Sequence, residues 1–220
     1  MPDGTQDAVR RMERSPIVVI LASGSPRRRE LLAQAGVPFE VVAPTIEELD
    51  ETTGHLPPTQ QAEALAYFKA RYVWDKDPAR WVLGADTMVA LGATILGKPA
   101  DRDDARRMLS SLSGTRHAVI TGVALIGPEG RWIASDHTFV TMRTLSPQEI
   151  EDYLASGQWA GKAGAYGIQE TPALRSATQS RVGDRFVERV EGSWSNVMGL
   201  PMELVGRMLA RIPVPTGGRR

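Results

Sequence analysis

Residues 17–36 read IVVILASGSPRRRELLAQAG and join two patterns of different period. The first six residues are apolar and mostly β-branched, which is typical of a strand buried on both faces of a sheet. A helix is expected next, because Ser25 is a favourable N-cap residue, Pro26 suits the first helical position and Gly36 suits the left-handed residue after a helix. The stretch therefore predicts a buried strand that leads directly into a helix.

The beginning of this helix carries groups that suit an anion. The hydroxyls and guanidiniums there belong to Ser23, Ser25, Arg27, Arg28 and Arg29. Together with the free N–H groups of a helix start, they favour a bound phosphate. A solvated basic surface is the alternative, although a cationic first turn opposes the helix dipole by up to about 1 kcal/mol.

Composition limits the class of protein. The chain has 220 residues, 42% of them hydrophobic, which is enough for one large α/β domain or two close lobes. Its 26 basic and 26 acidic residues cancel, so no overall field attracts nucleic acid or anionic lipid. The absence of cysteine excludes disulfides, thiolate zinc sites and cysteine nucleophiles. No apolar segment approaches the roughly 20 residues of a membrane span, so we expect a cytoplasmic protein with no nucleic-acid or membrane partner.

The folded part is expected to cover residues 16–212. Residues 1–15 are polar and aperiodic, so we expect a disordered leader. The short terminal segment 213–220 is expected to be a disordered tail. The apolar run at 16–22 is at the lower length limit of a secretory signal and lacks a cleavage site. A buried strand explains it better.

The rest of the chain alternates strand and helix patterns. Thr59 is expected to cap a long amphipathic helix, and Asp101 and Ser146 to cap two later ones. The inward face of the long helix is expected to hold Ala62, Leu65, Ala66, Phe68 and Val73. Further strands are expected over 39–42, 81–91, 116–126, 132–145 and 184–191, the third and fourth of these as an antiparallel hairpin, and a last helix over 202–209.

Asp86 is the single charge in the strand pattern 81–91. An ionised carboxylate among apolar residues is costly unless it is paired, hydrogen-bonded or bound to a metal. We therefore interpret Asp86 as a candidate catalytic or metal-binding group. The alternative is a structural aspartate that local N–H groups satisfy.

The acidic segment at 46–51 is a second candidate for metal binding. Beside a triphosphate site, a carboxylate such as Glu48 suits Mg²⁺ or Mn²⁺, whereas most acidic loops only solvate a surface. His55, His117 and His137 lack the spacing of metal ligands, so each is expected to be a surface or a satisfied structural histidine.

Seven short motifs in order resemble the Maf family of nucleoside triphosphate pyrophosphatases. They are LASGSPRR, IEE, the helix with Lys69, GADT, LGKP, KAGAYGIQ and NVMGLP. The resemblance implies an α/β fold with a mixed twisted sheet in two lobes around a deep cleft, related to the inosine triphosphate pyrophosphatases, and usually a homodimer. It also implies hydrolysis of nucleoside triphosphates to the monophosphate and pyrophosphate with Mg²⁺ or Mn²⁺.

The resemblance also implies roles for single positions. Asp86 matches the family's proton acceptor, and Glu48 matches its acidic metal-binding position beside Asp86. The cationic phosphate contacts match Arg27, Arg28, Lys69 and Lys98, and the hydroxyls of the helix start, Ser23 and Ser25, complete this set of substrate-binding residues.

Substrate choice is associated in the family with positions that here hold Arg27, Thr87 and Gln169, as in the branch that acts on dTTP and UTP. The Gln169 amide can pair with both O4 and N3–H of a pyrimidine. The segment after Gln169 is longer than usual for the family, which leaves the shape of the pocket open.

Two other classes of function stay open on the residues alone. A nucleotide-binding regulator of cell division with weak or incidental hydrolysis would bind a triphosphate tightly and form no pyrophosphate. A nucleic-acid-binding module is disfavoured by the zero net charge and by the lack of a basic patch with interleaved aromatic residues.

Overall fold

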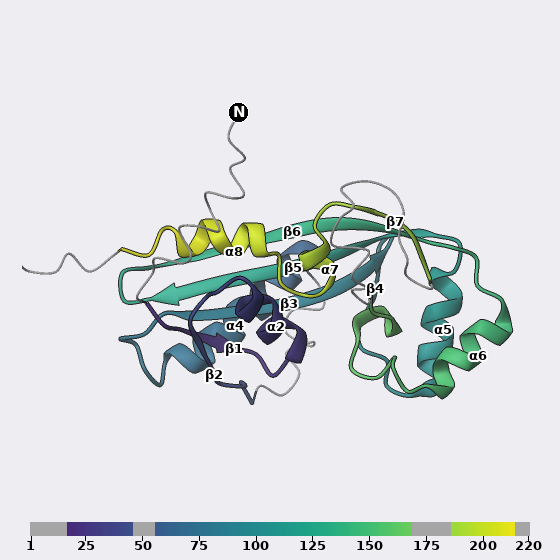
Figure 1. Cartoon of the computed structure of the whole chain (residues 1–220), viewed down its shortest axis with the longest axis horizontal. Coiled ribbons are helices and arrows are strands. Elements are labelled where there is room, and N and C mark those ends of the chain that lie inside the picture. The colour runs from purple at the N-terminus through teal and green to yellow at the C-terminus, as the bar shows by residue number, and fades with distance from the viewer. Residues whose placement is uncertain (1–16, 46–55, 169–185, 214–220) are drawn as a thin grey trace, which may run out of the picture. The chain divides into compact units, whose positions relative to one another are not determined.

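A computed structural model describes residues 17–45, 56–168 and 186–213 of the chain (Figure 1). Its strands are β1 (Val19–Ala22), β2 (Phe39–Val41), β3 (Val82–Leu91), β4 (Thr94–Leu96), β5 (Arg116–Gly127), β6 (Gly130–Met142) and β7 (Val187–Glu191). Its helices are α2 (Pro26–Gln34), α4 (Pro58–Trp74), α5 (Arg102–Leu112), α6 (Pro147–Ala155), the 3₁₀ turn η1 (Ala163–Ala165), α7 (Trp194–Val197) and α8 (Met202–Leu209). The strand order is β2-β1-β3-β5-β6-β7, with β4 paired to β3.

The sheet is mixed, which confirms the predicted α/β class. Strand β1 is parallel to both β2 and β3, whereas β4 pairs with β3 and β7 with β6 in antiparallel fashion. The chain divides into two compact units, and β3, β5 and β6 contribute residues to both. Unit 1 draws on the ranges Met1–Asp86, Gly122–Ser135 and Gly199–Arg220, and unit 2 on Thr87–Thr121 and Asp136–Met198.

In unit 1, the stretch 17–36 folds as its pattern predicts. All four residues of β1 are buried, and helix α2 begins at Pro26 after the N-cap residue Ser25. Gly36 follows the end of the helix with φ +68°, a conformation that a glycine adopts at little cost. Strand β1 therefore delivers the chain directly to the start of α2.

Two glycines let helix α4 lie directly on the sheet in unit 1. A Cβ added to Gly84 of β3 would stand 2.4 Å from the Ala66 carbonyl oxygen of α4. A Cβ added to Gly122 of β5 would stand 2.2 Å from the carbonyl oxygen of Ala62. No side chain fits at either position, so the α4 backbone meets the strands themselves.

Two predictions about α4 are wrong. The helix begins at Pro58 after Pro57, and no side chain caps it, so Thr59 is a helical residue. Pro58 is suited to this start because its ring fixes φ and its missing N–H is not needed there. Phe68, expected inside, is 36% exposed, because it lies about 200° around the helix from Ala66 and Ala70, which meet Gly84.

The predictions for helices α5 and α6 of unit 2 are confirmed. The Asp101 side chain accepts a hydrogen bond from the Asp104 N–H, and Ser146 and Glu149 form a complete capping box. The predicted apolar face of α5 is buried throughout: Ala105, Met108, Leu109 and Leu112. The two helices lie side by side (Figure 1), and Arg102 of α5 donates to the Glu151 carboxylate of α6 at 2.9 Å.

Three short elements of unit 2 were not expected: strand β4, the 3₁₀ turn η1 and helix α7. Strand β4 has three residues and α7 has four, and neither is long enough to show a hydrophobic period. Helix α7 begins where Ser193 accepts a hydrogen bond from the Asn196 N–H.

In all the ranges described, no helix combines the length and the apolar character that crossing a membrane requires.

His117 is a core residue of unit 2. It is 2% exposed, and its Nε2 lies 2.5 Å from the Tyr166 hydroxyl, whereas its Nδ1 has no partner among the described residues. Burial lowers the pKa of His117 from 6.5 to about 4. His137 is exposed, and His55 lies outside the described residues. The expectation of a surface histidine is confirmed for His137. His117 is structural, as expected, but its Nδ1 is not satisfied by any described residue.

We expect the free energy of unfolding to fall as the pH drops from about 6.5 to about 4 because of His117. In that window the unfolded state binds a proton that the folded state rejects, at a total cost of roughly 3 kcal/mol. His117→Phe removes the titrating group, so urea unfolding from pH 7 to pH 4 is expected to show a shallower loss of stability. His137→Gln is the matched control and keeps the wild-type slope; equal slopes for His117→Phe and wild type would refute the assignment.

Gly84→Ala is expected to destabilise the protein by about 1–3 kcal/mol or more, because the new methyl group overlaps the α4 backbone. Urea unfolding measures the change. Gly97→Ala is the control, since a Cβ at Gly97 meets nothing within 4 Å and its φ is not positive. A Gly84→Ala protein as stable as Gly97→Ala would contradict the direct contact between α4 and β3.

Candidate functional site

The candidate site of unit 1 lies at the carboxyl end of β1, beside the middle of its parallel neighbour β3. The last register pair between them joins Ala22 of β1 to Gly84 of β3. Beyond that pair, β1 leaves the sheet toward α2, whereas β3 continues through Asp86. Asp86 therefore lies at the edge where α2 begins, and ligands of open α/β sheets bind at this edge.

Lys69 is the partner of the Asp86 carboxylate. Residues 84 and 86 point to the same face of β3 because side chains alternate along a strand, and α4 covers that face at Gly84. Lys69 precedes Ala70, which contacts Gly84, so its side chain reaches Asp86 and forms an ion pair. The Asp86 side chain is 14% exposed and that of Lys69 is 28% exposed. The buried charge is thus compensated by a cation from α4.

Arg28 links the start of α2 to two other segments of unit 1. Its Nε donates to the Gly199 carbonyl oxygen at 2.7 Å, and its Nη1 donates to Ser23 Oγ at 3.0 Å. The side chain keeps a partly exposed surface. Burial of the guanidinium lowers the pKa of Arg28, and the negative charge of Asp86 opposes that shift. Arg28 therefore lies within electrostatic reach of Asp86.

Ser23, rather than Ser25, holds the beginning of α2. Ser25 occupies the N-cap position, but its side chain makes no capping hydrogen bond. Instead, the Ser25 N–H donates to Ser23 Oγ at 3.2 Å, and this oxygen also accepts from Arg28. Ser23 is 5% exposed, so a buried hydroxyl fixes both groups. Ser25 is thus the N-cap residue, as predicted, but its side chain makes no capping hydrogen bond.

The side chains brought together at this edge carry two cations and one carboxylate, Lys69, Arg28 and Asp86. Arg27, in the first turn of α2, is half-buried and adds a third positive charge to the same segment. An excess of positive charge beside a helix N-terminus favours an anion such as a phosphate chain. The Asp86 carboxylate among these cations is a group that can accept a proton at the same place.

Thr87 belongs to unit 2, although it follows Asp86 in β3. Its hydroxyl lies 3.0 Å from the hydroxyl of Thr121 in β5. Lys98 is exposed just after β4 in the same unit. Its role as a phosphate contact stays a prediction, and the predicted positions Glu48 and Gln169 lie outside the described residues.

Two contacts of this region had no signal in the sequence. Gly199, whose carbonyl oxygen holds Arg28, and Asn196, whose carbonyl oxygen holds Thr121, both belong to the motif NVMGLP. Main-chain carbonyl groups are common to all residues, so only the three-dimensional fold identifies these two. The motif marks the segment without indicating its contacts.

A metal site is not assembled by the described residues alone. Within 17–45, 56–168 and 186–213, no three His, Asp or Glu side chains gather in a metal-binding arrangement. Asp86 supplies hard oxygen atoms of the kind that Mg²⁺ and Mn²⁺ prefer. The second predicted ligand, Glu48, lies in the segment that the structure does not describe, so the metal site stays a prediction.

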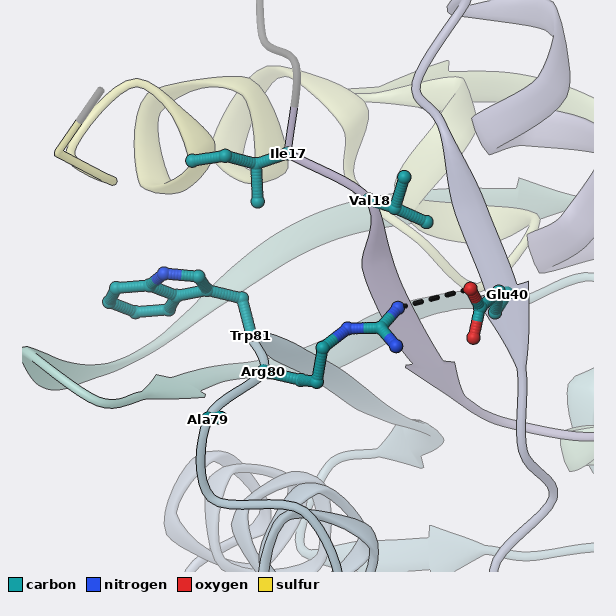
Figure 2. A pocket seen from close by; sticks show the side chains of 6 residues that line it. All are labelled: Ile17, Val18, Glu40, Ala79, Arg80 and Trp81. Atoms are coloured by element: carbon teal, nitrogen blue, oxygen red, sulfur yellow. Dashed lines mark ion pairs between the residues drawn. The ribbon is translucent and has the colours of Figure 1, made fainter. Parts of the chain in front are cut away.

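A hollow of about 370 Å³ lies at the opposite, amino ends of β1 and β3 (Figure 2). In Figure 2 the Arg80 guanidinium reaches across it to the Glu40 carboxylate, at 3.2 Å. The residues that line it are Ile17, Val18, Glu40, Ala79, Arg80 and Trp81. This hollow contains none of the predicted site residues and is separate from the edge that holds Asp86.

Comparison with known proteins assigns the chain to a protein family. The family model described as "Maf-like protein" matches residues 18–212. A dTTP/UTP pyrophosphatase of Moorella thermoacetica is 45% identical over 205 residues, covering 91% of this chain and 98% of that protein. A dTTP/UTP pyrophosphatase of Deinococcus radiodurans is 45% identical over 191 residues, covering 87% and 91%. Among solved structures, a HAM1 protein from Coxiella burnetii is 15% identical, with a TM-score of 0.49 over 88% of this chain and 98% of that one.

Ser23→Ala is expected to lower the free energy of unfolding by about 1–3 kcal/mol, because it leaves the Ser25 N–H and one Arg28 donor without their acceptor. Ser25→Ala is the matched control and is expected to change stability by less than about 0.5 kcal/mol, since its side chain caps nothing. Urea unfolding of both variants measures the difference. The reverse order of the two costs would show that Ser25 caps α2 after all.

Proposed function

Because this chain belongs to the family of Maf-like proteins, we propose that it hydrolyses dTTP and UTP to the nucleoside monophosphate and pyrophosphate. Relatives that are 45% identical over most of both chains are named dTTP/UTP pyrophosphatases, which supports this substrate class. The observation that carries the proposal is the ion pair of Asp86 and Lys69, with Arg28 in electrostatic reach, on β3 beside the carboxyl end of β1.

The cations at this edge bind the phosphate chain in the proposed reaction. Arg28 is fixed by Ser23 and Gly199, so its position does not depend on the ligand. Lys69 exchanges part of its contact with Asp86 for a phosphate oxygen. Arg27 adds to the neutralisation of charge, and Lys98 is proposed as a further phosphate contact. Preorganised cations of this kind stabilise the negative charge that develops on the leaving pyrophosphate.

Asp86 acts as the proton acceptor for the attacking water. The water oxygen forms a bond to the α-phosphorus, the bond from this phosphorus to the oxygen bridging the α- and β-phosphates breaks, and pyrophosphate leaves with that oxygen. The water proton passes to an Asp86 oxygen. Lys69 holds the carboxylate in place through the ion pair, which orients the acceptor toward the phosphate chain.

A divalent cation fits this arrangement in part. Asp86 with Glu48 would hold it, because carboxylate oxygens are the ligands that Mg²⁺ and Mn²⁺ prefer. When bound, the ion supplies positive charge that polarises a phosphoryl oxygen. We propose that this ion is Mg²⁺ or Mn²⁺.

Selection of a pyrimidine base is assigned to Arg27, Thr87 and Gln169. The Gln169 amide presents a donor and an acceptor, which matches O4 and N3–H of uracil and thymine.

A homodimer, usual for the family that the motifs resemble, is part of the same proposal, and light scattering of the purified protein tests it.

Asp86→Asn is expected to lower pyrophosphate release from dTTP and UTP by about 10²–10⁴-fold, because the amide keeps the shape of the side chain but cannot take the proton. A coupled pyrophosphate assay with Mg²⁺ measures kcat and KM. Asp77→Asn is the matched control: Asp77 is exposed in the turn after α4, and its variant is expected to keep wild-type kinetics.

Two results would overturn the proposal. An Asp86→Asn protein with wild-type turnover would remove the proposed base. Tight binding of dTTP to the wild type by calorimetry, without pyrophosphate formation, would instead identify a nucleotide-binding regulator. Circular dichroism of each variant confirms that a loss of activity is not a loss of fold.

A further inference from the structure

Arg28 is tied to a residue of unit 1 that lies 171 positions later in the chain. Its Nε donates to the Gly199 carbonyl oxygen at 2.7 Å, and its Nη1 donates to Ser23 Oγ at 3.0 Å. Neither acceptor carries a charge, so these two contacts orient the guanidinium without neutralising it, as a carboxylate partner would. Arg28 is therefore held in one direction as a cation, within electrostatic reach of Asp86.

The Gly199 carbonyl oxygen is placed by a backbone conformation that favours glycine. Gly199 has a φ of +108°, which residues with a Cβ rarely adopt. The chain that follows has little freedom to absorb a change, because Leu200 is 0% exposed and the ring of Pro201, the N-cap residue of α8, fixes its φ at −70°. A side chain at position 199 would therefore turn the carbonyl oxygen away from Arg28.

We infer that Gly199 is a positioning residue whose carbonyl oxygen orients the Arg28 guanidinium toward a bound phosphate chain. The inference rests on the proposed function, in which Arg28 binds the triphosphate. An arginine side chain that rotates freely loses conformational entropy when an anion orders it. The contact with Gly199 orders the side chain in advance, so the phosphate chain binds more tightly.

Binding of inorganic pyrophosphate, the product of the proposed reaction, tests this role without any contribution from a base or a sugar. Calorimetry measures its Kd for the wild type, Gly199→Ala, Arg28→Lys and the double variant. Arg28→Lys keeps the positive charge but has no Nε to donate to Gly199.

Gly199→Ala is expected to raise the Kd by about fivefold or more in the wild-type background, through the loss of one hydrogen bond to a charged group. In the Arg28→Lys background the same change is expected to raise the Kd by less than about twofold, because the contact is already gone. A merely structural role for Gly199 would instead raise the Kd by the same factor in both backgrounds.

Gly157→Ala is the matched control for backbone strain. Gly157 has a φ of +68° in unit 2, and a Cβ there meets nothing within 4 Å. This variant is expected to keep the wild-type Kd for pyrophosphate.

Equal factors in the two backgrounds would overturn the inference, and so would an unchanged Kd in Gly199→Ala or a wild type that does not bind pyrophosphate. If Gly199→Ala does not fold, nuclear magnetic resonance of the wild type decides. The Arg28 Nε–H signal, assigned by its loss in Arg28→Lys, is expected to exchange slowly with water both with and without pyrophosphate. Slow exchange only with pyrophosphate, or in neither state, would show that Gly199 does not order the side chain.

The proposed function fails on a different measurement. A wild type that releases no pyrophosphate from dTTP refutes it, whatever the Kd values of the variants. Additive effects of Gly199→Ala and Arg28→Lys on the Kd refute the role of Gly199 and leave the hydrolysis of dTTP intact.

Discussion

The ion pair between Lys69 and Asp86 depends on a contact that no side chain makes. Gly84 of β3 has no Cβ, so the α4 backbone lies directly on the strand, with the Ala66 carbonyl oxygen 2.4 Å from where a Cβ would be. Asp86 points to the same face two residues later, and only a helix this close places Lys69 beside it. The cost of burying a carboxylate is thereby offset by a cation from a neighbouring element. A charged group is thereby kept on β3, beside the carboxyl end of β1.

Arg28 and the start of α2 are also held in place by contacts within unit 1. Ser23 accepts from both Arg28 and the Ser25 N–H, so one buried hydroxyl fixes the helix start and the guanidinium together. Arg28 also donates to Gly199, which ties the start of α2 to the segment before α8. These positions are set without a ligand, so the proposed binding of a phosphate chain needs little reorganisation of Arg28. Two cations and a carboxylate thus lie together within unit 1.

The sequence was most informative where one local rule decides the structure. The strand and helix of residues 17–36, and the cap at Asp101, depend on neighbours within a few positions, and both are confirmed. The prediction for Phe68 was wrong, although the other four residues predicted for the inner face of α4, Ala62, Leu65, Ala66 and Val73, are buried. The face of α4 that meets the strand is set by the contact of Ala66 and Ala70 with Gly84, which is a tertiary contact.

The most direct measurement is a crystal structure of the protein with a non-hydrolysable α,β-imido analogue of dUTP and Mg²⁺. We predict that the triphosphate lies beside the carboxyl end of β1, with its oxygens in hydrogen-bond distance of Lys69 and Arg28 and the α-phosphorus beside Asp86. A nucleotide bound in the hollow of Arg80 and Glu40, or elsewhere away from Asp86, would contradict the assignment of this edge as the active site.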